Sequence, residues 1–190
     1  MMKFLTHTLV ALVAATAGGS GVYYFVPPTI VQEMPVESPE QWEVRHSPRG
    51  GCTAHIVEEI DKAKQQIYVW SYSFTSLPIA DALIRAHQRG VKVGVVIDGN
   101  SVHANGGKAM HMVHNDVLVY ADRAHAIQHQ KVMAIDGTLI FGSFNWTVSA
   151  ETRNSEVLIT LRNCKIEMYA KFVSNWRLHQ EHGELLRKPK

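Results

Sequence analysis

The spacing of apolar residues between positions 52 and 186 alternates between a helical period and short β-branched runs, and this alternation limits the fold most strongly. In "TAHIVEEIDKAKQQ" apolar residues recur at helical spacing, and the β-branched and aromatic "IYVWSYSF" that follows predicts a strand over 67–74. The stretch "SLPIADALIRAHQRG" predicts a second helix, which Gly90 ends. The mostly apolar "VKVGVVID" is typical of a strand that is buried on both faces.

The same alternation continues through the second half of the chain. "DVLVYA" and "EVLITL" predict strands over 116–121 and 156–161, and Asp136-Gly137 joins "KVMAID" to "TLIFGSF" in a hairpin. The amphipathic "CKIEMYAKFVSNWRLHQEH" predicts a last helix. We therefore expect an α/β domain over 52–186, with a mixed central β-sheet that is flanked by helices on both faces.

Residues 1–26 have the features of a targeting segment. Lys3 supplies a positive charge, a long apolar run follows, and "ATA" at 15–17 fits a small-x-small cleavage signal. We expect a cleaved signal peptide and an exported protein, either periplasmic or secreted. The alternative is a retained N-terminal anchor over 4–26, which would bring the protein into contact with a membrane. Residues 27–51 are rich in proline, glycine and charge, and they predict a linker.

The composition narrows the class of protein. Hydrophobic residues make up 46% of the 190 residues, which argues against a disordered chain and fits one domain with short appendages. The formal net charge is only +2, so any affinity for phosphate has to come from a local patch. The two cysteines, Cys52 and Cys164, either pair in an oxidising compartment or remain separate buried thiols, and the sequence leaves both readings open.

The stretch "HQKVMAIDGTLIFGSFNW", which begins at His129, carries several polar groups on otherwise apolar strands. His129 and Lys131 are two residues apart, so their side chains share one face of an extended strand. The same holds for Ser143 and Asn145. Asp136 has the opposite parity to His129 and lies at a strand end, so we expect it to be structural.

These residue types suit chemistry on a phosphodiester. A neutral imidazole such as that of His129 can attack phosphorus and form a phosphohistidine. The charge of Lys131 suits phosphate oxygens, and Ser143 and Asn145 can donate hydrogen bonds to the same oxygens. A serine nucleophile is disfavoured, because "FGSFN" lacks the G-x-S-x-G pattern that presents such a serine.

Two further residues are expected to support the site. Gly142 lets the backbone approach a phosphate closely, because glycine has no side chain. Glu156, in "RNSEVLI", is the candidate carboxylate that fixes the tautomer of His129 and raises its basicity.

At these positions the chain resembles the phospholipase D superfamily, whose HKD motif is written H-x-K-x4-D-x6-G-S-x-N. The matching residues are His129, Lys131, Asp136, Gly142, Ser143 and Asn145. One departure is that five residues, not six, separate the aspartate from the glycine. Over residues 45–186 the chain is similar to the single-motif, Nuc-type endonucleases of bacteria.

The resemblance implies a role for each matching residue. It makes His129 the nucleophile, makes Lys131 and Asn145 phosphate-binding residues, gives Ser143 a supporting role, and makes Glu156 the residue that orients the histidine. It also implies that no metal or other cofactor is required, and that the protein acts as a homodimer.

The chemistry itself also favours a dimer. One imidazole attacks phosphorus, and a second group must protonate the leaving oxygen. The chain offers one H-x-K and no internal repeat. A twofold axis that places His129 beside its symmetry mate would supply both groups.

Two other features have competing interpretations. The histidines at 103, 111, 114 and 125 lack the spacing and local carboxylates of a zinc signature such as H-E-x-x-H, so we expect exposed loop histidines and no metal site. Trp70, Tyr72 and Phe74 alternate along the predicted strand and would share one face. Packing in the core is the simpler reading, and stacking on bases is the functional one.

From the sequence we expect a metal-independent phosphodiesterase, and most specifically a non-specific endonuclease that cleaves DNA or RNA through a phosphohistidine in a dimer-shared site. One alternative is a phospholipid-hydrolysing enzyme of the phospholipase D type, which a retained N-terminal anchor would favour. Another is a nucleic-acid-binding module without turnover.

Overall fold

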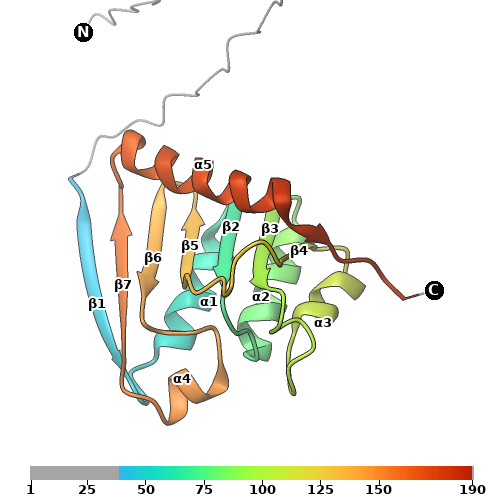
Figure 1. The fold of residues 1–190 in the computed structure, drawn as a ribbon. Coiled ribbons are helices and arrows are strands. Elements are labelled where there is room, and N and C mark those ends of the chain that lie inside the picture. The colour runs from blue at the N-terminus through green and yellow to red at the C-terminus, as the bar shows by residue number, and fades with distance from the viewer. Residues whose placement is uncertain (1–38, 190) are drawn as a thin grey trace, which may run out of the picture. The chain divides into compact units, whose positions relative to one another are not determined.

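The structure is a computed structural model, and it describes residues 39–189 (Figure 1). One mixed sheet of eight strands forms its centre, in the order β1-β7-β6-β5-β2-β3-β4-β8. The strands are β1 (Gln41–Ser47), β2 (Gln66–Ser71), β3 (Lys92–Asp98), β4 (Leu118–Asp122), β5 (Val132–Ile135), β6 (Thr138–Gly142), β7 (Glu156–Arg162) and β8 (Glu184–Leu185). β2, β3 and β4 are parallel, and every other neighbouring pair is antiparallel.

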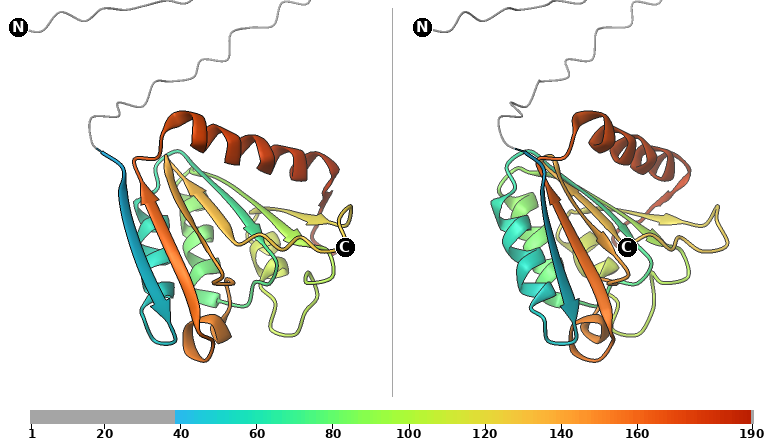
Figure 2. Two further views of the ribbon diagram at one scale, coloured as in Figure 1. Left: turned by 60° about the vertical axis from the view of Figure 1, so that its left-hand side comes forward. Right: turned by 90° about the vertical axis from the view of Figure 1, so that its left-hand side faces the viewer.

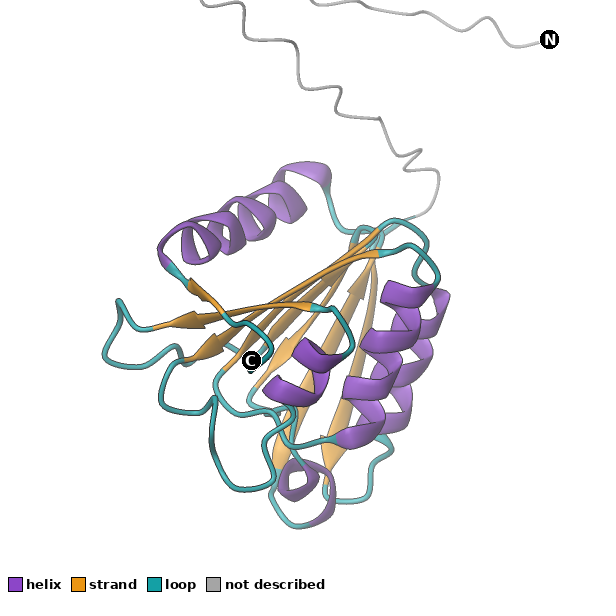
Figure 3. Cartoon of the chain, turned by 90° about the vertical axis from the view of Figure 1, so that its right-hand side faces the viewer, coloured by secondary structure: helices purple, strands orange, loops and turns teal. Residues whose placement is uncertain are grey.

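Helices cover both faces of this sheet (Figures 2 and 3). The helices are α1 (Cys52–Lys62), α2 (Leu77–Gln88), α3 (Ala109–His114), α4 (Val148–Thr152) and α5 (Ile166–His182). α1, α2 and α3 pack on one face, while α5 crosses the other face alone. The expected α/β fold is therefore confirmed. No helix within residues 39–189 has both the length and the apolar character needed to cross a membrane.

Two apolar cores lie on opposite sides of the sheet. The larger core fills the space under α1, α2 and α3, and the smaller one lies under α5. At the second core, Trp176 packs directly over Gly94, where an added Cβ would lie 2.5 Å from the indole ring. Cys52 belongs to the larger core and Cys164 to the smaller one, and both are free thiols. The two cysteines therefore do not pair, because the sheet separates them.

The predicted linker over 27–51 is wrong for its last part, because Gln41–Ser47 forms the edge strand β1. This strand pairs antiparallel with β7, from Gln41 opposite Arg162 to Ser47 opposite Glu156. An edge strand needs only one partner, and the apolar residues of β1 stay in contact with solvent, so the segment lacks the pattern of a buried strand. The proposed targeting segment, 1–26, lies outside the described residues.

The strand predicted over 67–74 ends early, at Ser71. The side chains of the three aromatic residues near its end therefore lie in different places from those predicted. Trp70 lies in the core under α5, whereas Phe74 lies in the opposite core. After Ser71 the chain leaves the sheet, and Phe74 forms a single bridge with Trp146. The three aromatic side chains therefore do not share one face, and Tyr72 between them is only partly buried.

Candidate active site

All the HKD residues except Asp136 lie at one end of the sheet, where β2 and β6 end and where β5 and β7 begin. The strand register explains this, because Val132 lies opposite both Trp70 and Phe141. His129 lies in the loop that leads into β5 and is exposed, whereas Lys131 is only 8% exposed. This end of the sheet therefore presents an accessible imidazole above a buried ammonium group.

Tyr72 lies between the histidine and the lysine of the motif. Its ring centroid is 4.8 Å from that of His129, edge to face, and the Lys131 Nζ atom lies 5.1 Å from the same centroid. Nζ also donates a hydrogen bond of 2.7 Å to the backbone oxygen of His129. Sequence reasoning missed this residue, because its only signal was an aromatic position near the end of a predicted strand. The contacts make Tyr72 a positioning residue for both groups.

Ser143 and Glu156 form a second group at the same end of the sheet. The Ser143 hydroxyl donates a 2.6 Å hydrogen bond to Glu156 Oε2 and accepts one of 3.1 Å from the Val157 amide. The Asn154 side chain donates to Glu156 Oε1 at 3.0 Å. Among the described residues Glu156 makes no hydrogen bond to His129, so its predicted role in orienting that imidazole stays a prediction.

Asn145 is half-buried and its carboxamide oxygen has no hydrogen-bond partner among residues 39–189. The hydroxyl of Ser71, at the end of β2, is buried and unpartnered as well. Most buried polar atoms in proteins have a partner, so unpaired ones at a candidate site indicate hydrogen-bonding capacity that a ligand can use.

The structure gives a reason for Gly142 that the sequence did not reveal. Its φ is +150°, and a Cβ at this position would lie 2.2 Å from the backbone oxygen of Val157 on β7. The close approach seen at Gly142 is to the neighbouring strand, and its predicted approach to a phosphate stays a prediction. The absence of a side chain at Gly142 keeps β6 and β7 close, which holds Ser143 within reach of Glu156.

Asp136 lies at the other end of the hairpin, away from His129. Asp136 and Gly137 form the two-residue turn between β5 and β6, with φ of 43° and 87°. The carboxylate accepts backbone hydrogen bonds from Lys64, Gln65 and Gln66 at 2.6, 3.1 and 2.8 Å. The shortened spacer before Gly142 therefore corresponds to a tight turn, which keeps the two strands paired as far as Phe141.

We expect Asp136→Ala to lower the free energy of unfolding by about 1–3 kcal/mol more than Asp116→Ala does, because three backbone amides lose their acceptor. Asp116 is the matched control, since its φ is also positive, at 63°, and within residues 39–189 its carboxylate forms an ion pair with the exposed Lys188 alone. Denaturant titration measures both variants. Equal losses of stability would show that the three hydrogen bonds contribute nothing net.

Burial lowers the pKa of Lys131 below its ordinary value, and the nearby carboxylate of Glu156 opposes this shift only in part. The charged form of Lys131 is therefore lost at a lower pH than for an exposed lysine. If that charge holds the phosphate, activity falls as the pH rises through the lowered pKa.

We expect Lys131→Arg to move the alkaline limb of the kcat/KM profile to higher pH, because a guanidinium keeps its proton throughout this range. Lys171→Arg, at an exposed position on α5, is the control substitution and should leave the limb where it is. A profile for Lys131→Arg that coincides with the wild-type profile would remove Lys131 from the groups that titrate in the reaction.

The four histidines considered as metal ligands do not come together. His111 pairs with Asp81 at 2.8 Å, and His114 bonds to the backbone oxygen of Met110. His125 instead joins a group that the sequence did not reveal, with Asp122, His179 and His182. This group lies outside the HKD residues, although the side chain of Gln130 reaches His179 at 3.3 Å.

Comparisons with known proteins identify the family. A family model described as "Cardiolipin synthase, PLD-like domain" matches residues 56–176. A protein of Rickettsia prowazekii named phospholipase D is 37% identical over 131 residues, which are 68% of this chain and 63% of that protein. A mitochondrial cardiolipin hydrolase of Xenopus laevis is 29% identical over 153 residues, which are 79% of this chain and 72% of that protein.

Solved structures agree with this result. The structure of Nuc from Salmonella typhimurium, a phospholipase D family member, has a TM-score of 0.75 and 33% identity, and the match covers 79% of this chain and all of that one. NucT from Helicobacter pylori shares the fold, with a TM-score of 0.67 and 23% identity, and covers 78% of this chain and all of that one. With His129, Lys131 and Ser143 at one end of a Nuc-like sheet, the chain belongs to the phospholipase D superfamily and is of the Nuc type.

Proposed function

We propose that the protein is a metal-independent phosphodiesterase that cleaves nucleic acid, and DNA in particular, without base-specific readout. The observation that carries this proposal is the exposed imidazole of His129 against the Tyr72 ring, with the buried ammonium group of Lys131 on the same ring. A free nucleophile beside a desolvated cation suits attack on an anionic phosphodiester.

In the proposed reaction, a ring nitrogen of His129 attacks phosphorus and the bond from phosphorus to the leaving oxygen breaks. The leaving oxygen takes a proton from a second imidazole, and a phosphohistidine remains. That second imidazole then removes a proton from water, which attacks phosphorus, and the bond to His129 breaks to release a phosphomonoester. Lys131 and Asn145 hold the non-bridging oxygens, while Ser143 keeps Glu156 in place.

The second imidazole is proposed to be His129 of a second copy of the chain. Three large apolar side chains are exposed near the site: Leu77 at 45%, Ile127 at 51% and Val148 at 55%. Ile127 precedes His129 by two residues, and the Val148 amide bonds to Thr75, close to Leu77 in the chain. An apolar rim of this kind suits contact with another protein surface, and a twofold contact here would bring two copies of His129 together.

Cations near the same end of the sheet support a nucleic-acid substrate. The backbone amide of Lys108 bonds to the Phe74 oxygen, which places this lysine on a loop beside the site. Arg153 is exposed directly after α4. Positive charge near an exposed nucleophile suits a polyanion that extends past the reacting phosphate.

The second candidate function is hydrolysis of phospholipid headgroups by the same chemistry. Its specific support is the apolar rim of Leu77, Ile127 and Val148, which also suits contact with a lipid surface, together with relatives named phospholipase D and mitochondrial cardiolipin hydrolase. A retained anchor at residues 4–26 would add to this case, and an exported enzyme without the anchor would weaken it.

The deciding experiment incubates the purified protein with supercoiled plasmid and, in parallel, with vesicles that contain cardiolipin and phosphatidylglycerol, both in excess EDTA. We expect nicked plasmid and intact lipid, with no nicking by His129→Ala. Hydrolysed lipid and intact plasmid would establish the second candidate. Plasmid binding without any nicking would indicate a module that binds nucleic acid and lacks turnover.

A further inference from the structure

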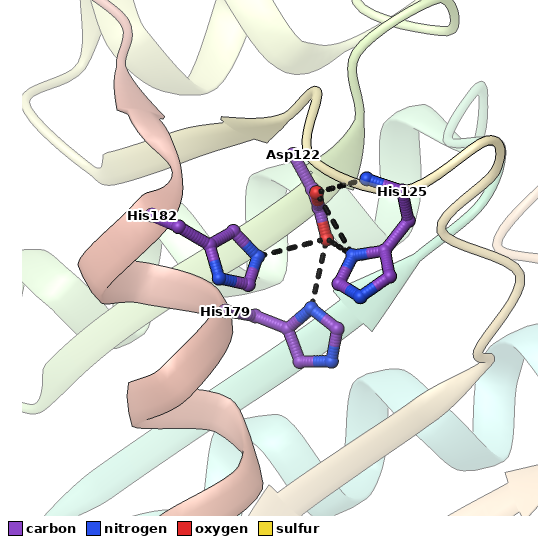
Figure 4. A group of neighbouring side chains, drawn as sticks. All are labelled: Asp122, His125, His179 and His182. Atoms are coloured by element: carbon purple, nitrogen blue, oxygen red, sulfur yellow. Dashed lines mark hydrogen bonds and ion pairs between the residues drawn. The ribbon is translucent and has the colours of Figure 1, made fainter.

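One buried carboxylate is surrounded by three imidazoles near the edge of the sheet that lies opposite β1. Asp122 is the last residue of β4, and His125 follows it in the loop that leads to the HKD motif. His179 and His182 belong to the last turn of α5 (Figure 4). The four side chains thus form two pairs, D-x-x-H and H-x-x-H, from segments that are more than fifty residues apart in the chain.

The ring nitrogens converge on one oxygen. Asp122 Oδ2 lies 2.8 Å from His179 Nδ1, 2.9 Å from His125 Nδ1 and 3.4 Å from His182 Nε2. The centroids of the three rings are 5.0, 5.2 and 5.3 Å apart, and one nitrogen or oxygen from each residue lies within 4.8 Å of all the others. Figure 4 shows the three imidazole rings arranged around the Asp122 carboxylate.

Hydrogen bonds alone do not account well for this arrangement. A carboxylate oxygen has about two lone-pair sites, whereas Asp122 Oδ2 is approached by three imidazole nitrogens. The other oxygen, Oδ1, already accepts a hydrogen bond of 3.0 Å from the Ala124 amide. Three neutral imidazoles and one carboxylate are, by contrast, a complete donor set for a tetrahedral transition-metal ion.

The surroundings also favour a cation. Asp122 is only 1% exposed, so its carboxylate oxygens lie inside the group and face the three imidazoles. His179 and His182 lie at the carbonyl end of a 17-residue helix, where the helix dipole stabilises positive charge. His125 and His182 are exposed, which leaves a path from solvent to the buried Asp122.

We propose that Asp122, His125, His179 and His182 bind one divalent transition-metal ion of the Zn²⁺ class. The ion would join the loop before the HKD motif to the end of α5. Gln130, between the two motif residues His129 and Lys131, contacts both His179, at 3.3 Å, and Asn175, at 3.4 Å. The ion therefore positions this loop, and it shares no ligand with the groups that act on phosphorus.

The test measures binding of Zn²⁺ to the full chain after chelator treatment, by calorimetry and by elemental analysis of the dialysed protein. The variant is His125→Gln/His182→Gln, which removes the two exposed ligands. The control is His103→Gln/His114→Gln, which removes two exposed histidines outside the group. We expect one ion per chain in the wild type and the control, and affinity at least 100-fold weaker in the variant.

Cobalt provides a second measurement that does not depend on activity. Co²⁺ in place of Zn²⁺ should give the intense visible absorption of a tetrahedral site in the wild type and the control, and not in the variant. Equal Zn²⁺ affinity in the wild type and the variant would overturn the proposal. If the double variant fails to fold by circular dichroism, His182→Gln alone decides the question, because it still removes one of four ligands.

The result is separable from the proposed phosphodiesterase activity. A protein that binds Zn²⁺ at these residues and fails to nick plasmid contradicts the proposed function alone. A protein that nicks plasmid equally well with and without Zn²⁺, and binds none, contradicts only the metal site.

Discussion

Replacing His129 by alanine is expected to reduce the rate of phosphodiester cleavage by at least ~10⁴-fold and to leave the fold intact. The loss is large because the substitution removes both the nucleophile and, in the proposed dimer, its acid partner, and residues that act as a unit lose nearly all activity together. The fold is unaffected because the His129 side chain is exposed and makes no hydrogen bond within residues 39–189. Plasmid nicking under single-turnover conditions measures the effect.

The control for this prediction is His103→Ala, which removes an exposed histidine from another loop. It should retain the wild-type rate. A covalent intermediate gives an independent check, since rapid quenching of the wild-type reaction at alkaline pH should trap phosphate on the protein, and His129→Ala should trap none. Cleavage by His129→Ala at the wild-type rate would assign the nucleophile to another residue.

A mixed dimer of one wild-type chain and one His129→Ala chain is expected to have an activity about 10²-fold or more below that of the wild-type dimer. In a composite site, each of the two histidines has its own role, and general acid catalysis contributes about 10²- to 10⁴-fold to such a reaction. If each chain had a complete site of its own, the mixed dimer would keep half of the activity. Co-expression with two different affinity tags, followed by purification on both, isolates the mixed species.

The matched control pairs wild type with His103→Ala under the same two tags, and it should be fully active. Half of the wild-type activity in the mixed dimer would contradict a shared site. Failure to recover any doubly tagged protein would contradict the dimer itself, and sedimentation of the active enzyme at working concentration checks that outcome.

Local patterns predicted most of the architecture correctly. The segments that form β3, β4 and β7 are short, apolar and bounded by turn residues, so the sequence pattern alone predicts them as strands. The Asp136-Gly137 turn was equally clear, because both positions require a positive φ that few other pairs adopt easily. The edge strand β1 was missed, because its single partner, β7, is more than a hundred residues away and its outer side stays in solvent.

At the candidate site, the spacing predicted that His129 and Lys131 share one face of a strand, whereas both lie before β5 begins at Val132 and meet at the ring of Tyr72. Their shared neighbour, Tyr72, directly follows the end of β2 at Ser71 and reaches them because β2 and β5 are paired. The reason for Gly142 was also invisible in the sequence, because the atom that excludes a side chain there belongs to Val157 on a neighbouring strand.

The sequence by itself determined the α/β alternation, the hairpin and the HKD residues, because each depends on residues that are close together in the chain. The tertiary structure alone decided which distant residues meet. The order of the strands placed Cys52 and Cys164 on opposite faces, and the path of α5 brought His179 and His182 to Asp122. Contacts of this kind depend on strand order and helix packing. These are set by the burial of the whole apolar surface, so no pattern in a short stretch of sequence predicts them.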